Sequence, residues 1–380
     1  QGVDCYLDSM TEYLTNKGWM KYDDITDDLL IGSISENREL IFTPILDRYK
    51  EKYNGVIYTY EDRYTKFSVT PNHKLWQSKL YRTSNDDSYK EYRSKWEFKT
   101  VEEYINQKGL SNYLSHLNNR KEGIKGIQDE WFFILGAYIG DGYITMRNNK
   151  PHCVHISQNE NKHLYDKLRS ISNSITFDKE TKLGKNYRFN FSSINLRNWI
   201  YNIVGTGSLN KRFPLEYFNK MSDTQFELFF EGLIHSDGTT DKKSGNMVYY
   251  SINKNLIDDL QLFLISRGIY CQIYEYPVSK SKFNNSTETY FHLNIPKNNK
   301  KEYKQLLKKN FKKYTVDDYI SCFTVNNGIL LTRNSNKIAI QGNTKNMMHL
   351  FRLLEMASKI GKGKGLQVRS HKVEVLMDIR

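Results

Sequence analysis

The sequence predicts a mixed fold in which an all-β domain, formed by the two ends of the chain, is interrupted by an α+β domain with an internal repeat. Two observations lead to this prediction. Strand-like segments with hairpin turns occupy both ends, with turns at 16–18 and 327–328. Between them, two apolar helical segments, 131–141 and 226–237, each end in Asp-Gly and are each followed by the pattern Ser-x-Asn-x-Asn.

The composition is that of a globular protein with two or three domains. The chain has 380 residues, of which 38% are hydrophobic and 26% are charged. No apolar run approaches the roughly 20 residues of a membrane span, and no signal peptide is visible at the start, so we expect no membrane partner. A formal net charge of +13 favours a polyanionic partner.

The cysteines indicate a reducing environment. They are few and widely spaced: Cys5, Cys153, Cys271 and Cys322. This pattern fits neither a disulfide framework nor a CxxC metal site. We therefore expect a cytoplasmic protein, which we take to be a monomer.

Residues at the two ends of the all-β part can rearrange peptide bonds. The thiol of Cys5 can attack the carbonyl before it and turn an amide into a thioester. Near the other end, Asn343 can cyclise its side-chain amide onto its own carbonyl, and the hydroxyl of Thr344 can accept an acyl group. Each of these residues alone is more often structural, so the segments around them decide the interpretation.

A Thr-x-x-His element, Thr70 and His73, follows the strand-like segment 66–69. Histidine titrates near neutrality, so an imidazole hydrogen-bonded to the scissile amide would polarise that amide and protonate its leaving nitrogen. The simpler alternative is a histidine in a surface loop.

Together these separated segments resemble an intein, a self-excising protein-splicing element with the Hint fold. Cys5 matches the first intein residue, and Thr70 with His73 matches the T-x-x-H block. Asn343 matches the last intein residue and Thr344 the first residue of the downstream extein. The resemblance implies self-catalysed splicing without a cofactor.

The resemblance also implies a division of the chain. Residues 5–126 and 315–343 would form the two parts of an all-β, horseshoe-like Hint splicing domain. Residues 1–4 and 344–380 would be remnants of the flanking extein segments, which are its partners in splicing. Joined together, these remnants resemble part of a nucleotidyltransferase of the polymerase-beta type, and the chain is expected to be an excerpt of a longer host protein.

Two positions depart from the intein pattern. Inteins usually carry histidine before the terminal asparagine, where this chain has Gly342, and we expect a histidine placed there to leave C-terminal cleavage unchanged or faster. Cys322 stands where the preceding block often has aspartate. In one intein class, which lacks an N-terminal nucleophile, a cysteine at this position carries the branch. We interpret Cys322 as an assisting or packing residue, and its role as a nucleophile is the alternative.

The repeated helices of the middle region bring two acids into equivalent positions. Small residues four apart, such as Gly136 and Gly140, allow two helix backbones to approach closely. Two such helices packed side by side would place Asp141 and Asp237 together at one end. The asparagines of the Ser-x-Asn-x-Asn patterns, Asn161 and Asn255, are expected to cap the helices that follow.

Strands of the middle region alternate apolar with polar or aromatic residues. Such alternation gives each sheet one apolar face and one polar face, and the polar face can contact bases and phosphates in a DNA groove. An ordinary solvated sheet face is the alternative for any single strand. The candidate DNA contacts are Arg188, Asn190, His155, Ser157, Tyr290, His292 and Asn294.

The middle region resembles a LAGLIDADG homing endonuclease in its single-chain, pseudo-twofold form. The two motif copies are LGAYIGDG and FEGLIHSDG, and Glu231 and His235 depart from the apolar residues usual in the second. The resemblance implies an α+β domain over residues 127–314, with αββαββα repeated in halves at about 127–207 and 220–300. Residues 208–218 would connect the halves, and a helix-like lysine run at 300–313 would follow them.

This resemblance implies Mg²⁺-dependent chemistry. Asp141 and Asp237 would be the metal-binding catalytic acids, and divalent ions would activate water for phosphodiester hydrolysis. The substrate would be double-stranded DNA, namely the intein-free host allele. Two alternatives remain: an intein whose endonuclease domain has decayed to DNA binding only, and a host nucleotidyltransferase fragment with a passive insertion.

Overall fold

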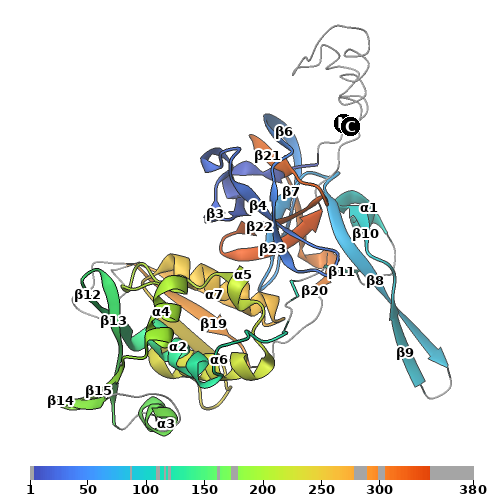
Figure 1. The fold of residues 1–380 in the computed structure, drawn as a ribbon. Coiled ribbons are helices and arrows are strands. Elements are labelled where there is room, and N and C mark those ends of the chain that lie inside the picture. The colour runs from blue at the N-terminus through green and yellow to red at the C-terminus, as the bar shows by residue number, and fades with distance from the viewer. Residues whose placement is uncertain are drawn as a thin grey trace. The chain divides into compact units, whose positions relative to one another are not determined.

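The computed structural model describes residues 4–85, 88–107, 112–114, 117–118, 121–160, 163–172, 179–277, 289–297 and 304–342. The chain divides into two compact units (Figure 1). The terminal unit contains residues 1–116 and 302–380, and the inserted unit contains residues 117–301. No helix in the described ranges is long and apolar enough to cross a membrane.

The terminal unit is built from strands. A closed barrel consists of β1 (Tyr6–Leu7), β21 (Phe311–Thr324), β6 (Asp47–Glu61) and β7 (Lys66–Val69). A six-stranded sheet contains β23 (Lys337–Gly342), β22 (Ile329–Asn334), β2 (Glu12–Thr15), β4 (Leu30–Ile34), β5 (Leu40–Pro44) and β3 (Gly18–Met20). A five-stranded sheet contains β10 (Glu97–Thr100), β8 (Lys74–Asn85), β11 (Asn112–Leu114), β20 (Lys304–Leu306) and β9 (Ser88–Arg93).

Its helices are short. The 3₁₀ turns are η1 (Asp8–Met10), η2 (Tyr22–Asp24) and η4 (Lys308–Asn310). The helix α1 (Val101–Asn106) begins at a capping box in which Thr100 and Glu103 satisfy each other's backbone N–H groups.

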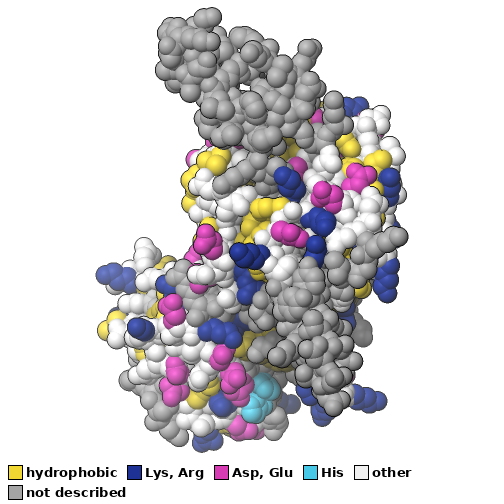
Figure 2. Space-filling model, turned by 90° about the vertical axis from the view of Figure 1, so that its right-hand side faces the viewer, with side chains coloured by type: hydrophobic (Ala, Val, Ile, Leu, Met, Phe, Trp, Pro, Cys, Tyr) yellow, Lys and Arg dark blue, Asp and Glu magenta, His cyan; other side chains and the backbone are white. Residues whose placement is uncertain are grey.

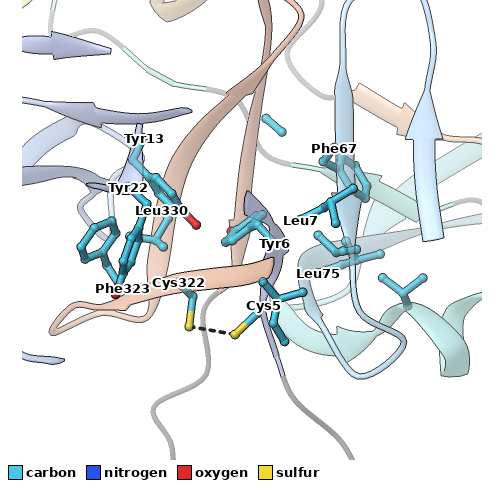
Figure 3. Close-up of a cluster of buried hydrophobic side chains, with 14 of the residues drawn as sticks. Cys5, Tyr6, Leu7, Tyr13, Tyr22, Phe67, Leu75, Cys322, Phe323 and Leu330 are labelled. Carbon is cyan, nitrogen blue, oxygen red and sulfur yellow. Dashed lines mark hydrogen bonds between the residues drawn. The ribbon is translucent and has the colours of Figure 1, made fainter. Parts of the chain in front are cut away.

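The core of the terminal unit mixes residues from both ends of the sequence. Tyr6 and Tyr13 from the first strands pack with Phe323 and Leu330 from the last ones, and all four are buried (Figure 3). The rings of Tyr13 and Phe323 meet edge to face at 4.9 Å. Because neither end can bury its apolar face alone, the two sequence segments fold as one domain.

The inserted unit contains two similar halves in sequence. The first half runs α2 (Glu130–Asp141), β12 (Gly142–Arg147), β13 (Lys150–Asn159), α3 (His163–Ser172), β14 (Lys179–Leu183), β15 (Asn186–Phe191) and α4 (Ile194–Ile203). After α5 (Leu215–Phe218), the second half runs α6 (Asp223–Asp237), β16 (Gly238–Thr240), β17 (Met247–Ser251), α7 (Lys254–Ser266), β18 (Gln272–Tyr276) and β19 (Tyr290–Ile295).

The order of elements matches the predicted repeat. The first half shows the full αββαββα order, and the second shows αββαββ within its described residues. Each half carries a four-stranded antiparallel sheet with the same strand order, β12-β13-β15-β14 in one and β16-β17-β19-β18 in the other. The two halves are therefore copies of one structural unit.

Glycines set the contact between α2 and α6. A side chain at Gly136 would lie 2.6 Å from the backbone nitrogen of Leu233, and one at Gly232 would lie 2.9 Å from that of Ala137. Any larger residue would have to push the helices apart, so the predicted close approach of the two backbones is present.

Both predicted boundaries of the inserted unit lie too far along the chain. The inserted unit begins at Leu117, not 127, and the Gly123 amide donates to the Lys220 carbonyl at 2.7 Å within this unit. It ends at Lys301, not 314, because β20 pairs with β11 and β21 pairs with β6 along its whole length.

Two smaller predictions also change. In the described part of the lysine run, Lys312 and Lys313 belong to strand β21 and not to a helix. Asn253, not Asn255, caps α7, because its side chain accepts the Leu256 amide at 3.0 Å. Asn161 lies outside the described residues.

Candidate functional site

The predicted splicing residues converge in the terminal unit. Strand β1 pairs with β7 on one side and with β21 on the other. Cys5 directly precedes β1 and Thr70 directly follows β7, while Cys322 lies on β21. Strand pairing therefore gathers residues that are more than 250 positions apart in the chain.

Thr70 holds the peptide bond between Asp4 and Cys5. Its hydroxyl accepts a hydrogen bond from the Cys5 amide nitrogen at 3.1 Å. Its backbone nitrogen donates to the Cys5 carbonyl oxygen at 3.1 Å. Sequence reasoning expected a histidine on this amide, whereas the structure places the threonine hydroxyl there.

His73 lies beside the residue before the junction. Its Nδ1 is 2.7 Å from Oδ1 of Asp4, an ion pair when the imidazole is protonated, although the ring N–H is not aligned on that oxygen as in a hydrogen bond. The same carboxylate oxygen accepts the Lys74 amide at 3.2 Å. The imidazole is completely buried, so the alternative of a surface-loop histidine is wrong.

The two cysteines of this site face each other. The Cys5 thiol donates to the Cys322 sulfur, with 3.2 Å between the two Sγ atoms (Figure 3). Cys5 is 1% exposed and Cys322 is 7% exposed. Cys322 is thus in direct contact with the predicted nucleophile as well as being part of the core.

Tyr6 extends from this site toward the C-terminal junction. Its hydroxyl lies 3.5 Å from the carbonyl oxygen of Gly342, and its ring meets the His73 ring at 4.6 Å. Burial, with the nearby Asp4 carboxyl, raises the pKa of this phenol well above its usual range, so Tyr6 remains a neutral O–H donor.

Asn343 and Thr344 lie outside the described residues, but Gly342, the residue before them, is described. Gly342 ends β23, and a Cβ there would run into the Lys74 carbonyl oxygen and lie 2.7 Å from the Phe98 ring. A histidine at position 342 would therefore require the Lys74 backbone or the Phe98 ring to move, and its effect on C-terminal cleavage stays a prediction. No signal in the sequence pointed to this contact.

A buried amide adjoins the same junction. Gln341 is completely buried, and neither atom of its amide has a hydrogen-bond partner among the described residues. A buried amide without a partner costs about 1–3 kcal/mol. The polar residues Asn343 and Thr344 follow Gln341 within three positions of the sequence.

The two predicted acids end equivalent helices of the inserted unit. Asp141 is the last residue of α2 and Asp237 the last residue of α6, and these helices pack together. Both carboxylates act electrostatically on the same two groups, Lys211 and Tyr249. The structure thus brings the acids to one region of this unit, as the repeat predicts.

Lys211 belongs to the segment 208–218, which was predicted to connect the two halves. No other role was predicted for it from the sequence. It is 3% exposed, and its ammonium donates to the carbonyl oxygens of Tyr138, Ile139 and Gly142 at 2.6, 3.0 and 2.8 Å. Burial lowers its pKa to about 8, against the opposing effect of the two acids. A lysine among hydrophobic connector residues was the signal available in the sequence.

Gln158 distinguishes the first acid from the second. Its Nε2 donates to Oδ2 of Asp141, while its Oε1 is buried with no hydrogen-bond partner among the described residues. In the second repeat the equivalent residue is Ile252. The environments of the two acids are therefore not identical.

The donors near the acids fit a hydrated hard cation. Two carboxylates and the orphaned Gln158 oxygen are oxygen ligands, which Mg²⁺ prefers, and Mg²⁺ keeps several waters in sites with few protein ligands. Among the described residues, no group of three or more His, Cys, Asp and Glu side chains forms a closed metal site. Such a site would depend on water and phosphate oxygens for its remaining ligands.

The departures in the second motif have a structural reason. Glu231 and His235 face α3 and not α2: His163 Nε2 lies 3.0 Å from Glu231 Oε1, and the His163 and His235 rings are 4.3 Å apart. These polar residues join the two halves and leave the glycine contact between α2 and α6 intact.

The candidate DNA contacts of the first half share one sheet face. His155 lies directly opposite Asn190 on neighbouring strands, and Ser157 lies opposite Arg188. His155 Nδ1 is 2.7 Å from Asn190 Oδ1, and both side chains are less than one-tenth exposed. This corrects the prediction for His155 and Asn190, which are buried: Asn190 Oδ1 accepts a hydrogen bond from Nε of the partly exposed Arg188 at 3.1 Å, and His155 contacts Asn190.

In the second half the alternation is as predicted. Tyr290, His292 and Asn294 are partly exposed, and the residues between them are buried. His292 is surrounded by tyrosine rings, with Tyr276 at 4.2 Å and Tyr250 at 4.5 Å. Burial lowers the pKa of both His155 and His292, so these imidazoles are neutral at neutral pH.

In the face shown in Figure 2, Lys and Arg side chains lie scattered among Asp and Glu side chains. A DNA interface on this protein would therefore be defined by the two polar sheet faces more than by a single basic patch on that face.

Among the comparisons with known proteins, the family match falls mainly in the second half of the inserted unit. Residues 226–309 match the family model described as a LAGLIDADG-like domain. A curated relative, the ATP-dependent Clp protease proteolytic subunit of Chlamydomonas moewusii, is 22% identical over an alignment of 276 residues that covers 67% of this chain. The match spans only 27% of that relative.

Likeness to solved structures is distant. The structure of I-DmoI in complex with DNA and Mn gives a TM-score of 0.31 at 19% identity, covering 44% of this chain and 89% of that one. The AceL NrdHF class 3 split intein gives a TM-score of 0.19 at 12% identity, covering 50% of this chain and 100% of that one. At these values neither likeness assigns a function.

Replacing Gly342 by alanine tests the packing before the C-terminal junction. We expect Gly342→Ala to lower the free energy of unfolding by about 1–3 kcal/mol, because the new methyl group meets a backbone oxygen that cannot rotate away. Urea unfolding of the two proteins measures this. Equal stability of Gly342→Ala and the wild type would contradict the close contact.

Proposed function

We propose that this protein is a self-splicing element that also cleaves double-stranded DNA at a specific site. The splicing proposal rests on one observation above all: the Thr70 hydroxyl holds the amide nitrogen of Cys5, so a thiol stands beside an immobilised peptide bond. The cleavage proposal rests on two equivalent helices, α2 and α6, which end at Asp141 and Asp237.

The first splicing step would take place at Cys5. Its sulfur attacks the Asp4 carbonyl carbon, the carbon–nitrogen bond breaks, and the released amine of Cys5 takes up a proton. Thr70 keeps the leaving nitrogen oriented, and the Cys322 sulfur receives the hydrogen bond of the attacking thiol. This geometry supports the assisting role of Cys322 over the nucleophile role.

The later steps would involve residues at the other end. Thr344 attacks the thioester, and Asn343 cyclises to release the joined flanks. Tyr6 and Gln341 would take the place of the absent histidine as positioning residues, because the Tyr6 hydroxyl reaches the Gly342 carbonyl and the Gln341 amide is buried nearby without a partner among the described residues. Because its chemistry needs a free thiol at Cys5, we place the protein in a reducing cytoplasm.

In the inserted unit, the acids would act on a phosphodiester. Asp141 and Asp237 would hold a divalent ion, which when bound supplies Lewis-acid stabilisation of the leaving oxygen. Lys211 keeps positive charge beside both carboxylates, and Gln158 fixes the orientation of Asp141. The match of residues 226–309 to a LAGLIDADG-like domain supports double-strand cleavage of the intein-free host allele.

The decayed-endonuclease alternative is weakened by the packing of the second motif. Glu231 and His235 pair with α3 and do not disturb α6 at Asp237. The host nucleotidyltransferase alternative depends on residues 1–4 and 344–380, of which the structure describes only Asp4, and it stays a prediction.

Two substitutions test splicing. Cys5→Ala removes the nucleophile, so we expect the 45.0 kDa chain to persist uncut at its N-terminal junction. Asn343→Ala removes cyclisation, so we expect a branched or N-terminally cleaved species. Mass spectrometry of the expressed chain distinguishes these products, and splicing by Cys5→Ala would make Cys322 the nucleophile.

Tyr6→Phe tests the positioning role at the C-terminal junction. The substitution keeps the ring contacts and removes the hydroxyl, so we expect slower C-terminal cleavage with unchanged thioester formation at Cys5. Tyr13→Phe is the matched control, because Tyr13 is also fully buried and its hydroxyl donates to the Ser321 carbonyl at 2.8 Å. Equal slowing in both variants would mean that the effect is structural.

Asp141→Asn and Asp237→Asn test the acids. Each change removes a metal-binding charge but no phosphate contact, so we expect loss of cleavage or restriction to nicking, with DNA binding retained. Splicing should continue in both, since the splicing residues lie in the terminal unit. Cleavage and gel-shift assays on the intein-free allele measure this, and full cleavage by Asp141→Asn would remove it from the site.

The pKa of Lys211 predicts a pH dependence. Because this pKa is about 8, the ammonium loses its proton as the pH rises through 8, and we expect cleavage to fall there while DNA binding persists. Rates of cleavage at saturating DNA across this range measure the effect. A rise through the same range would instead identify the neutral amine as a proton acceptor.

A further inference from the structure

The contact between Cys5 and Cys322 is fixed by strand register. The ladder of β1 and β21 pairs Tyr6 with Ser321 and Leu7 with Ile320. Continued by one residue, the same antiparallel register sets Cys5 directly opposite Cys322. The two thiols are reduced and their sulfurs are 3.2 Å apart (Figure 3).

This arrangement meets the distance requirement of a disulfide. Directly opposed residues on antiparallel strands have Cα atoms about 4.5–5.5 Å apart. Disulfides span Cα distances of about 4.4–6.8 Å. Bond formation therefore needs only a small rotation of two side chains that already point at each other, and no movement of the sheet.

The other two cysteines have different surroundings. Cys153 and Cys271 belong to the inserted unit, where their sulfurs approach the carbonyl oxygens of Val154 and Gln261. Burial also raises the pKa of the Cys271 thiol far above its usual range, which disfavours the reactive thiolate. Cys5 is as deeply buried as Cys271, so the 3.2 Å contact between the sulfurs of Cys5 and Cys322 is what selects this pair for disulfide formation.

We propose that Cys5 and Cys322 form a reversible oxidation site that switches splicing off in the presence of peroxide. One thiol reduces hydrogen peroxide, becoming a sulfenic acid and releasing water; the second thiol then displaces a second water to form the disulfide. Two thiols and one peroxide thus give one disulfide and two waters. The proposal rests on the proposed role of Cys5 as the splicing nucleophile.

The consequence for splicing follows from the chemistry of the first step. In the disulfide, Cys5 has no thiol with which to attack the Asp4 carbonyl, so no thioester forms. Reduction returns both thiols to the register that the strands maintain, and the site regains its starting geometry. Excision would then occur only under reducing conditions. The oxidised precursor would stay unspliced until it is reduced.

The experiment uses the full-length Asn343→Ala, Thr344→Ala protein, in which the thioester at Cys5 can neither transfer to residue 344 nor be followed by cyclisation at residue 343. One sample is kept reduced, a second is treated with hydrogen peroxide, and a third is treated with peroxide and then with a phosphine. Hydroxylamine, which cleaves thioesters and leaves disulfides intact, reports thioester formation at Cys5. Differential alkylation with peptide mass spectrometry reports which cysteines are joined.

We expect the peroxide sample to contain the cross-linked Cys5 and Cys322 peptides and to resist hydroxylamine, and we expect phosphine to restore cleavage. Cys322→Ser should lose the cross-link, while Cys271→Ser, the matched control, should keep it. Pairing with Cys153 or Cys271, or hydroxylamine cleavage equal to that of the reduced sample, would overturn the proposal.

Failure of the proposed function gives a different result. If the reduced sample resists hydroxylamine although the cross-link forms after peroxide, the oxidation site exists but Cys5 does not initiate splicing, and a switch of splicing is overturned. If the reduced sample is cleaved and no cross-link forms, splicing chemistry stands and the oxidation site is overturned.

Discussion

The pairing of β1 on both of its edges is the constraint on which the terminal unit depends. Tyr6 pairs with Val69 on one side and with Ser321 on the other, so this two-residue strand closes the barrel. Its position fixes Cys5 against Thr70 and against Cys322 at once. A shift of one residue would turn the Cys5 side chain to the opposite face of the sheet and separate it from Cys322. Register alone thus determines which groups meet Cys5, the proposed nucleophile.

In the inserted unit, close helix packing has the equivalent role. Gly136 and Gly232 allow the backbones of α2 and α6 to touch, and this contact sets the two terminal acids in one region. The twofold resemblance is not complete, because Gln158 contacts Asp141 whereas Ile252 takes the equivalent place in the second half. Duplication therefore explains the scaffold, and later divergence explains the differences in the environments of the acids.

The sequence predicted those features that depend on local pattern. Alternating residues predicted the polar face of β19, and the Asp-Gly repeats predicted the ends of α2 and α6. It did not predict features that depend on contacts between distant segments. The steric exclusion at Gly342 arises from Lys74 and Phe98, and the pairing of Cys5 with Cys322 arises from strand register. His155 and Asn190 alternated as expected, yet neighbouring strands bury them.

Buried polar side-chain groups without hydrogen-bond partners lower the stability of the fold. His73 Nε2 and both amide atoms of Gln341 are buried with no hydrogen-bond partner among the described residues, and each such group costs about 1–3 kcal/mol. Local rules favour apolar residues at these positions, and departures from those rules concentrate at functional sites. His73 adjoins Asp4 before the first junction, and Gln341 stands two residues before Asn343. These two residues therefore lie near the two junctions that splicing would break, His73 in space and Gln341 in sequence.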